Sequence, residues 1–225
     1  PLYGQLCSFQ ERYSQAELIA VGGMKRILKV LDRHGNRYLA MARLHEDASD
    51  LLFDPFIREA RLTALLDHPN IISVHDVGID KGGKPYFTMD LKAGDGLDVV
   101  LQKALADGGC PLSDRLEIFL KVCDAITYAH SRDVIHLDLK PANIQVGHYG
   151  EVLVCDWGLG KLIGGTDEVD DDVLLNPDLL SGMTVYGKVK GTPGYMAPEQ
   201  IRGESQDKRT DIYALGALLY AVLTC

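Results

Sequence analysis

The chain has 225 residues, of which 46% are hydrophobic and 24% charged, an ordinary composition for one large globular domain or a two-lobed one. Its formal net charge of -9 argues against nucleic acid and anionic membranes as partners, and no apolar run reaches the roughly 18 residues that a membrane helix needs. The five cysteines stand singly and are odd in number, which favours reduced thiols and a cytoplasmic location over disulfides or a zinc site.

The first ninety or so residues have the pattern of an antiparallel sheet with one helix. The segment 54–67 carries one apolar face and ends at His68-Pro69, which predicts a helix. A glycine-rich step at 94–96 predicts a boundary between a first part, 1–92, and a second part, 93–225. Runs of apolar and β-branched residues between turn residues predict strands at 17–21, 26–32, 37–44, 71–78 and 84–91.

The second part is predicted to be mainly helical. Ser113 is expected to cap a long helix whose apolar run extends through 118–130, and Asp211 is expected to open the last helix. The acidic run 167–172 is interpreted as a solvated loop, with a docking patch for a basic substrate or a self-inhibitory segment as the alternative. The other predicted elements are a helix at 97–107 and strands at 134–135 and 151–155.

Three short motifs carry candidate chemistry. The first is the loop His136-Leu137-Asp138-Leu139-Lys140-Pro141-Ala142-Asn143, which brings together an acid, a base and an amide. The second, Asp156-Trp157-Gly158, follows a predicted strand, and the third is Ala197-Pro198-Glu199. Phosphoryl transfer from a magnesium nucleotide needs an acid that orients the attacking hydroxyl and oxygen ligands for the metal, and this set of residues supplies both.

The three motifs, in this order, resemble those of eukaryotic-type serine/threonine protein kinases. The resemblance implies an α+β, two-lobed fold with a small antiparallel-sheet lobe at 1–92 and a mainly helical lobe at 93–225. It implies ATP and Mg²⁺ as cofactors and a protein substrate or signalling partner. Since the chain stops inside the central helix of the large lobe, we expect either that it belongs to a longer protein or that something else completes the lobe. Glu199 is expected to lack the arginine that normally pairs with it.

The resemblance also assigns roles to individual residues. Asp138 would orient the substrate hydroxyl as the catalytic acid–base, Lys140 would steady the transferring phosphoryl group, and Asn143 and Asp156 would hold the metal. Thr192 matches the threonine of the substrate loop that contacts the catalytic aspartate. The residues implied around the nucleotide are Gly22, Gly23, Lys25, Ile27, Ala40, Glu59, Met89, Asp90, Leu91, Gln145 and Asp156.

The chain departs from the family pattern where the nucleotide phosphates would lie. Ala42 stands where the family has a lysine, and Arg43 should point to the opposite face of its strand. Lys25, at the third-glycine position of the phosphate loop, resembles the relocated lysine of the with-no-lysine kinases, and Glu59 would be its partner. Lys29 is the less favoured substitute. The plainer alternatives are a hairpin turn at Gly22-Gly23, a solvated lysine and a surface glutamate.

Three further substitutions bear on activity. Leu137 replaces the arginine that clamps a phosphorylated activation loop, so activity should not depend on that clamp. Gln145 replaces an apolar residue under the adenine, which weakens the expectation of ordinary ATP affinity. Trp157 replaces a phenylalanine and keeps a large aromatic ring.

Three functions are therefore open. The leading one is transfer of the ATP γ-phosphate to serine or threonine hydroxyls of proteins. The alternative is a pseudokinase that binds or scaffolds without turnover, favoured by Ala42, Gln145 and the incomplete glycine loop, and opposed by the intact catalytic residues. A small-molecule phosphotransferase is the third, disfavoured by Thr192 and by Ala197-Pro198-Glu199.

Overall fold

The structure is a computed structural model that describes residues 12–91, 93–107, 109–163 and 192–225. The acidic run 167–172 therefore lies outside the described residues. The chain divides into two units, of which the first is formed by Pro1–Ala64 and Ser73–Lys92 and the second by Leu65–Ile72 and Ala93–Cys225.

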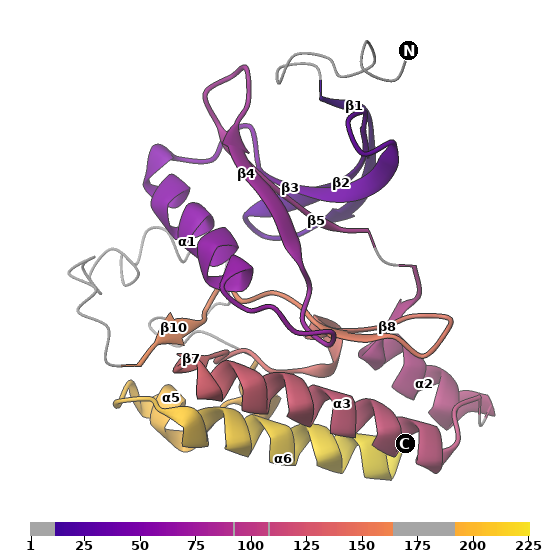
Figure 1. The fold of residues 1–225 in the computed structure, drawn as a ribbon. Coiled ribbons are helices and arrows are strands. Elements are labelled where there is room, and N and C mark those ends of the chain that lie inside the picture. The colour runs from indigo at the N-terminus through magenta and orange to yellow at the C-terminus, as the bar shows by residue number, and fades with distance from the viewer. Residues whose placement is uncertain (1–11, 92, 108, 164–191) are drawn as a thin grey trace. The chain divides into compact units, whose positions relative to one another are not determined.

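The first unit is built on a five-stranded antiparallel sheet (Figure 1) with the strand order β1-β2-β3-β5-β4. The first strand begins at Tyr13 and includes the predicted range 17–21, and two register shifts interrupt its pairing with β2, between Ser14 and Glu17 and between Leu18 and Ala20. The bounds are Tyr13–Val21 for β1, Lys25–Asp32 for β2, Arg37–Leu44 for β3, Val74–Ile79 for β4 and Pro85–Asp90 for β5.

One helix covers one face of this sheet. Helix α1, Phe53–Ala64, follows a short 3₁₀ turn, η3, at Asp50–Leu52. It ends at Ala64, three residues before the predicted end. The cluster that joins helix and sheet consists of Ala42, Leu44, Phe56, Ala60 and Phe87, all buried.

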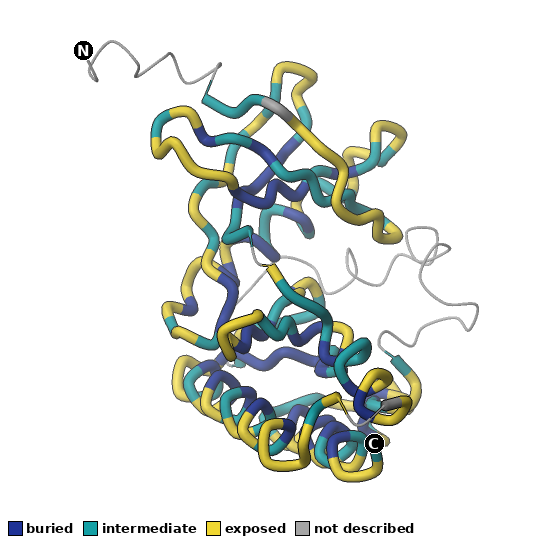
Figure 2. The backbone as a smooth tube through the Cα atoms, turned by 90° about the vertical axis from the view of Figure 1, so that its right-hand side faces the viewer, coloured by how far each residue is buried: buried dark blue, intermediate teal, exposed yellow. Residues whose placement is uncertain are grey.

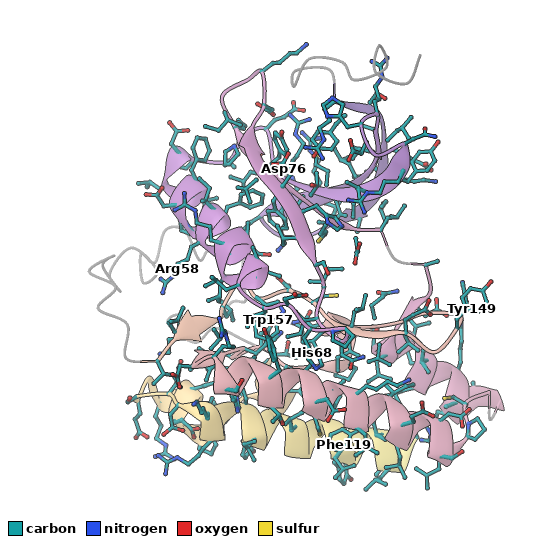
Figure 3. The ribbon with its side chains drawn as sticks, in the orientation of Figure 1. Arg58, His68, Asp76, Phe119, Tyr149 and Trp157 are labelled. Atoms are coloured by element: carbon teal, nitrogen blue, oxygen red, sulfur yellow. The ribbon has the colours of Figure 1, made fainter. Side chains whose placement is uncertain are left out.

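The other face of the sheet carries a smaller apolar cluster and a charged network. Asp32, only 1% exposed, accepts hydrogen bonds from the Arg12 guanidinium at 3.0 and 3.1 Å. Arg12 also reaches Asp76, labelled in Figure 3, and the Tyr13 hydroxyl donates to the same carboxylate at 2.9 Å. The network ties the start of β1 to β2 and β4, and the guanidinium of Arg12 lowers the pKa of Asp32.

We expect Asp32→Ala to lower the free energy of unfolding by about 2 kcal/mol, because it removes charged hydrogen bonds from a buried site. Since the pKa of Asp32 is lower in the folded state than the unfolded value of about 3.9, its contribution is complete above that pH. The difference between wild type and variant should therefore shrink as the pH falls through the depressed folded pKa. Urea unfolding measured over a pH series tests this.

The control for this prediction is Glu17→Ala, because Glu17 is 74% exposed and its carboxylate lies 3.9 Å from the Lys29 ammonium. Exposed pairs of this kind contribute little to stability. Equal destabilisation by the two variants would contradict the role given to the buried network.

The second unit is mainly helical, which confirms the predicted α+β class (Figure 1). Helices α3 and α6 pack together, each carries buried side chains such as Ala125 and Leu218, and their outer sides are exposed (Figure 2). Two small sheets accompany them, one with the order β6-β8-β9 and one formed by β7 and β10. The helices are α2, Leu97–Asp107; α3, Leu112–Ser131; α5, Pro198–Arg202; and α6, Lys208–Thr224. The remaining elements are β6, Asp95–Gly96; β7, Val134–Ile135; β8, Ile144–Val146; β9, Val152–Val154; β10, Lys161–Leu162; and the 3₁₀ turns η4, Pro141–Asn143, and η6, Pro193–Tyr195.

The segment Leu65–Ile72 belongs to the second unit, which corrects the strand predicted at 71–78. Ile71 forms a parallel bridge with Val154 of β9, and the Ile72 amide donates to the Val154 carbonyl at 3.1 Å. His68, labelled in Figure 3, stacks on Tyr128 of α3 with 5.1 Å between ring centres. The strand of the first unit therefore starts only at Val74, since the residues before it already pair elsewhere.

Within the ranges given above, no helix has both the length and the apolar character needed to cross a membrane.

The helix caps differ from the prediction. Helix α3 starts at Leu112 without a side-chain cap, and the Ser113 hydroxyl donates instead to Asp114 at 2.9 Å, so the cap predicted at Ser113 is wrong. Helix α6 starts at Lys208, three residues before Asp211, and Asp207 caps it by accepting from the Arg209 amide at 2.8 Å.

We expect Asp207→Ala to lower the midpoint of thermal unfolding by about 2–4 °C, because the first turn of α6 loses its side-chain acceptor. Ser113→Ala should leave the midpoint unchanged, since its hydroxyl bonds no backbone amide in the described structure. Differential scanning calorimetry on both variants decides this, and a larger loss for Ser113→Ala would contradict the assignment of the caps.

Candidate active site

The first unit places Lys25 against Glu59. Lys25 and Ile27 of β2 pair with Leu44 and Ala42 of β3, and paired residues of antiparallel strands share a face of the sheet. That face is the one covered by α1, so the Lys25 ammonium meets the carboxylate of Glu59 from this helix. Glu59 is 9% exposed, and the Lys25 ammonium lies 6.0 Å from the centre of the Phe87 ring.

Position 42 itself lies among buried apolar residues. Ala42 is fully buried, pairs with Ile27 on one side and Phe87 on the other, and belongs to the apolar cluster under α1. Arg43 follows it on the opposite face, where its guanidinium bonds Asp80. The strand therefore has no cation on the side of Glu59.

Lys29 lies on the same face of β2 as Lys25 but farther along the strand. Its ammonium is 4.7 Å from the centre of the Tyr38 ring and 3.9 Å from the Glu17 carboxylate. Of the two candidate lysines, Lys25 is thus the one in contact with Glu59.

The turn between β1 and β2 is closed by its own backbone. The Gly22 amide donates to the Lys25 carbonyl at 2.8 Å, and the Gly22 carbonyl lies 2.8 Å from the His45 ring. The His45 amide in turn donates to the Met24 carbonyl at 3.2 Å. The Gly22 amide is therefore engaged within the hairpin.

Ala40, Met89, Asp90 and Leu91 lie at the far end of the same sheet. Ala40 of β3 pairs with Met89 of β5, so both share the face of Ala42, and Met89 packs against the cluster under α1. The Asp90 amide donates to the Ser73 carbonyl at 3.1 Å, while its carboxylate lies 2.9 Å from His75. Leu91 follows β5 directly and is half-buried.

The second unit brings together Asp138, Lys140 and Asn143. The Lys140 ammonium lies 2.7 Å from Asp138 Oδ2, and the Asn143 amide nitrogen donates to the same oxygen at 3.1 Å and to the Asp138 carbonyl at 2.8 Å. Both side-chain contacts use Oδ2, so Oδ1 has no hydrogen bond to the part of the chain that is described. A carboxylate held in this way has one oxygen left to accept a proton donor such as a hydroxyl.

The backbone before Asp138 is held from α6. Asp211 is 1% exposed, and its two oxygens accept from the His136 and Leu137 amides, each at 2.9 Å. The His130 ring lies 2.8 Å from the same carboxylate. Leu137 has a φ of 66°, in the left-handed region that costs a leucine about 1–2 kcal/mol, so these bonds hold a strained backbone in place.

His136 connects the catalytic loop with the segment before Asp156. Its Nδ1 accepts from the Asp138 amide at 3.2 Å and its Nε2 lies 3.1 Å from the Cys155 carbonyl, which assigns the proton to Nε2 of a neutral ring. The ring is fully buried and packs against Trp157, labelled in Figure 3, at 4.5 Å between centres. His136 therefore acts as a structural link.

Asn143 and Asp156 are brought close by the β8–β9 hairpin. Ile144 pairs with Val154, and the Cys155 amide donates to the Asn143 carbonyl at 2.9 Å, so the two candidate metal ligands lie at neighbouring strand ends. Asp156 is exposed and has a φ of 62°.

The donor set fits Mg²⁺. The amide nitrogen of Asn143 is directed at Asp138, which leaves its oxygen as the free ligand, and Asp156 adds a carboxylate. Mg²⁺ commonly takes one or two protein oxygens and completes its shell with phosphate and water. No group of three or more His, Cys, Asp or Glu suited to a metal occurs in the described ranges.

Two other predicted site residues make fewer contacts. Gln145 of β8 pairs with Leu153 and Gly96, and its half-buried side chain makes no hydrogen bond within the described residues. Thr192 precedes η6, and no hydrogen bond joins its hydroxyl to Asp138 in the part of the chain described here, although the family resemblance implies that contact.

The structure also shows two polar residues that the sequence alone does not identify. Thr210, 1% exposed, donates to the Glu199 carboxylate at 2.8 Å, so Glu199 has a partner from α6. Gln200, 6% exposed, donates to the Leu137 carbonyl at 2.8 Å. Both bonds join residues that only the tertiary fold brings together, although the polar side chain of Gln200 beside Ala197-Pro198-Glu199 is a signal that could have been followed.

Comparison with known proteins agrees with this geometry. Residues 13–225 match the family model described as protein kinase domain. The chain is 38% identical to the serine/threonine-protein kinase PknD of Chlamydia caviae over 226 residues, which is 95% of this chain and 24% of that protein. It is 39% identical to PknD of Chlamydia abortus over 230 residues, or 95% and 24% of the two chains.

PknD of Chlamydia trachomatis serovar D is 38% identical over 232 residues, covering 95% of this chain and 25% of that protein. The chain thus spans about a quarter of the length of the curated relatives that it matches. Because the family model covers nearly all of the sequence, the chain belongs to the protein kinase domain family.

Proposed function

We propose that this domain transfers the γ-phosphoryl group of ATP to serine and threonine hydroxyls of protein substrates. The observation that carries the proposal is the Asp138 carboxylate, which is fixed through Oδ2 by Lys140 and Asn143 and keeps Oδ1 for a substrate hydroxyl. The serine/threonine class is supported by the printed names of the PknD relatives.

In the proposed reaction, Asp138 orients the hydroxyl and accepts its proton as the oxygen attacks the γ-phosphorus, and the bond from that phosphorus to the β,γ-bridging oxygen breaks, so that ADP leaves. The Lys140 ammonium, 2.7 Å from that carboxylate, lies where it can offset the negative charge of the transferring group. The serine and threonine hydroxyls need this help because they are weak nucleophiles at neutral pH.

The first unit would hold the nucleotide. We propose that the Lys25 ammonium, oriented by Glu59, binds the phosphates in place of a lysine at position 42. Gly22, Gly23, Ile27 and Ala40 would surround the phosphates and the adenine ring. The proposed hinge contacts are Met89, Asp90 and Leu91.

Further roles are proposed for residues of the second unit. Gln145 is proposed to lie under the adenine, and Thr192 to belong to the loop that receives the substrate. Asn143 and Asp156 would hold Mg²⁺, which when bound neutralises charge on the phosphate oxygens.

For the whole protein, a protein substrate or signalling partner is proposed, with no role for nucleic acid or membrane in this segment. A cytoplasmic location is proposed from the scattered single cysteines. The fraction of the relatives that is matched supports a longer chain around this domain.

A pseudokinase remains the second candidate, and one observation favours it specifically. The Gly22 amide is bonded within its own hairpin, so a phosphate would have to displace that bond or do without it. Ala42 and Gln145 also favour the pseudokinase, because each replaces a residue that normally contributes to nucleotide affinity.

Transfer of radiolabelled phosphate from magnesium ATP to casein, followed by phosphoamino-acid analysis, separates the two functions. The kinase proposal expects labelled phosphoserine or phosphothreonine with the wild-type protein and none with Asp138→Asn. If the domain is a pseudokinase, both proteins should give the same background labelling. This holds whether or not they bind a fluorescent ATP analogue.

A further inference from the structure

We infer that Gln200 is a positioning residue for Asp138, an inference that rests on the proposed function. Gln200 lies in α5, just after Ala197-Pro198-Glu199, and is 63 positions from Leu137 in sequence. Its amide nitrogen nevertheless donates to the Leu137 carbonyl at 2.8 Å. This carbonyl belongs to the peptide group that immediately precedes Asp138.

Both polar groups of that peptide are fixed. Its carbonyl accepts from Gln200, and its amide, on Asp138, donates to His136 Nδ1 at 3.2 Å. The preceding amide, on Leu137, is held by Asp211. The φ of 66° at Leu137 is one that leucine rarely adopts, so a peptide with fewer bonds would relax away from it.

The side chain of Gln200 is used at both ends. Its oxygen accepts from the Ala197 amide at 3.0 Å, and its nitrogen serves Leu137. Gln200 is 6% exposed, so water cannot readily replace either bond. One amide thus joins the segment at Ala197 to the backbone that carries the catalytic carboxylate.

Helix α5 is itself tied to α6, since the Thr210 hydroxyl donates to Glu199. The position of Asp138 therefore depends on two links from α6, one direct through Asp211 and one through Glu199 and Gln200. Displacement of residues 197–200 would leave the Leu137 carbonyl buried without its donor. The link thereby makes the order of this segment a condition for the geometry of Asp138.

A simpler role for Gln200 is capping of the short helix α5, which needs only its oxygen. Gln200→Glu separates the two roles, because a carboxylate keeps the shape and still accepts from the Ala197 amide. When ionised, it cannot donate to the Leu137 carbonyl. When protonated, it can donate again.

The experiment measures phosphate transfer by the full-length protein from pH 6 to 8, with Gln200→Glu, Gln200→Met and the exposed control Gln102→Glu. A positioning role expects a kcat for Gln200→Glu about tenfold or more below wild type at the alkaline end, where the carboxylate is ionised, with KM for ATP within about twofold. The other titratable side chains around the Leu137 peptide, His136, Asp138 and Asp211, are present in all four proteins.

Gln200→Met should lose kcat at every pH, because it neither donates nor accepts. If that variant fails to fold, Gln200→Glu decides alone, since it keeps the cap. A kcat for Gln200→Glu that follows wild type across the whole range overturns the inference and leaves capping as the role of Gln200.

Hydrogen–deuterium exchange of peptides covering 134–140 gives a readout that needs no activity. If Gln200 holds the Leu137 carbonyl, exchange should be faster in Gln200→Glu at pH 8 than in wild type or Gln102→Glu. Unchanged exchange overturns the inference. If the wild-type protein transfers no phosphate, the proposed function fails by itself, while the exchange data still decide whether Gln200 holds this peptide.

Discussion

Replacement of Asp138 by asparagine should lower kcat for phosphate transfer by about 10³-fold while leaving the fold intact. The amide has the shape of the carboxylate and can still accept a hydrogen bond from Lys140 or donate to a neighbour, so the loop keeps its packing. It cannot accept the proton of the substrate hydroxyl. Steady-state transfer of radiolabel to casein, with thermal unfolding measured on the same samples, tests both halves of this expectation.

The matched control is Asp124→Asn, which makes the same chemical change at an exposed position on α3. It should keep wild-type kcat and KM. Retention of more than a tenth of wild-type kcat by Asp138→Asn would contradict its role as the acid–base. Equal loss in both variants would indicate a general effect of charge.

The parts of the candidate site that sequence can predict are those in which partners are close along the chain. Lys140 and Asn143 are within five positions of Asp138, so a single loop brings them together. The contact between Lys25 and Glu59 also follows from simple geometry, because alternation along β2 places Lys25 on the face that a helix must cover. In these cases the local sequence pattern is enough to predict which side chains lie close together.

The contacts that sequence does not predict are those made by tertiary pairing. Nothing in the run 71–78 shows that Ile71 and Ile72 pair with β9 rather than extending β4, since both partners are apolar and β-branched. The sequence also does not predict the bond between Thr210 and Glu199, because either residue could lie on an exposed helix surface. Ser113 is not the cap of helix α3, because the helix begins before it, at Leu112.

Leu137 illustrates how a replaced residue can change what holds a loop. The sequence predicts only the loss of an arginine and its charge. In the structure the leucine side chain is 8% exposed, and its strained backbone is held by Asp211 at the amide and Gln200 at the carbonyl. The loop is therefore fixed by neutral and carboxylate hydrogen bonds to its backbone, which require no phosphorylated residue.

Replacement of Lys25 by methionine should lower kcat/KM for ATP by about 10²–10³-fold, because a single positioned cation is lost from the phosphate site. Methionine keeps the length and much of the apolar stem of lysine, so packing against the sheet should persist. The loss is expected because Ala42 is buried in an apolar cluster and Arg43 bonds Asp80 on the other face, so neither position supplies a substitute cation.

Lys29→Met is the matched control, since Lys29 lies on the same strand and the same face but contacts Tyr38 and Glu17. It should stay within about twofold of wild type, a difference well below the kcat/KM change that loss of a phosphate cation causes. Glu59→Gln should lower kcat/KM less than Lys25→Met, and adding it to Lys25→Met should cost little more, because the two side chains act as one unit. Full activity of Lys25→Met, or a larger loss in Lys29→Met, would contradict the relocated lysine even if Asp138→Asn proves inactive, because the two results test residues of different units.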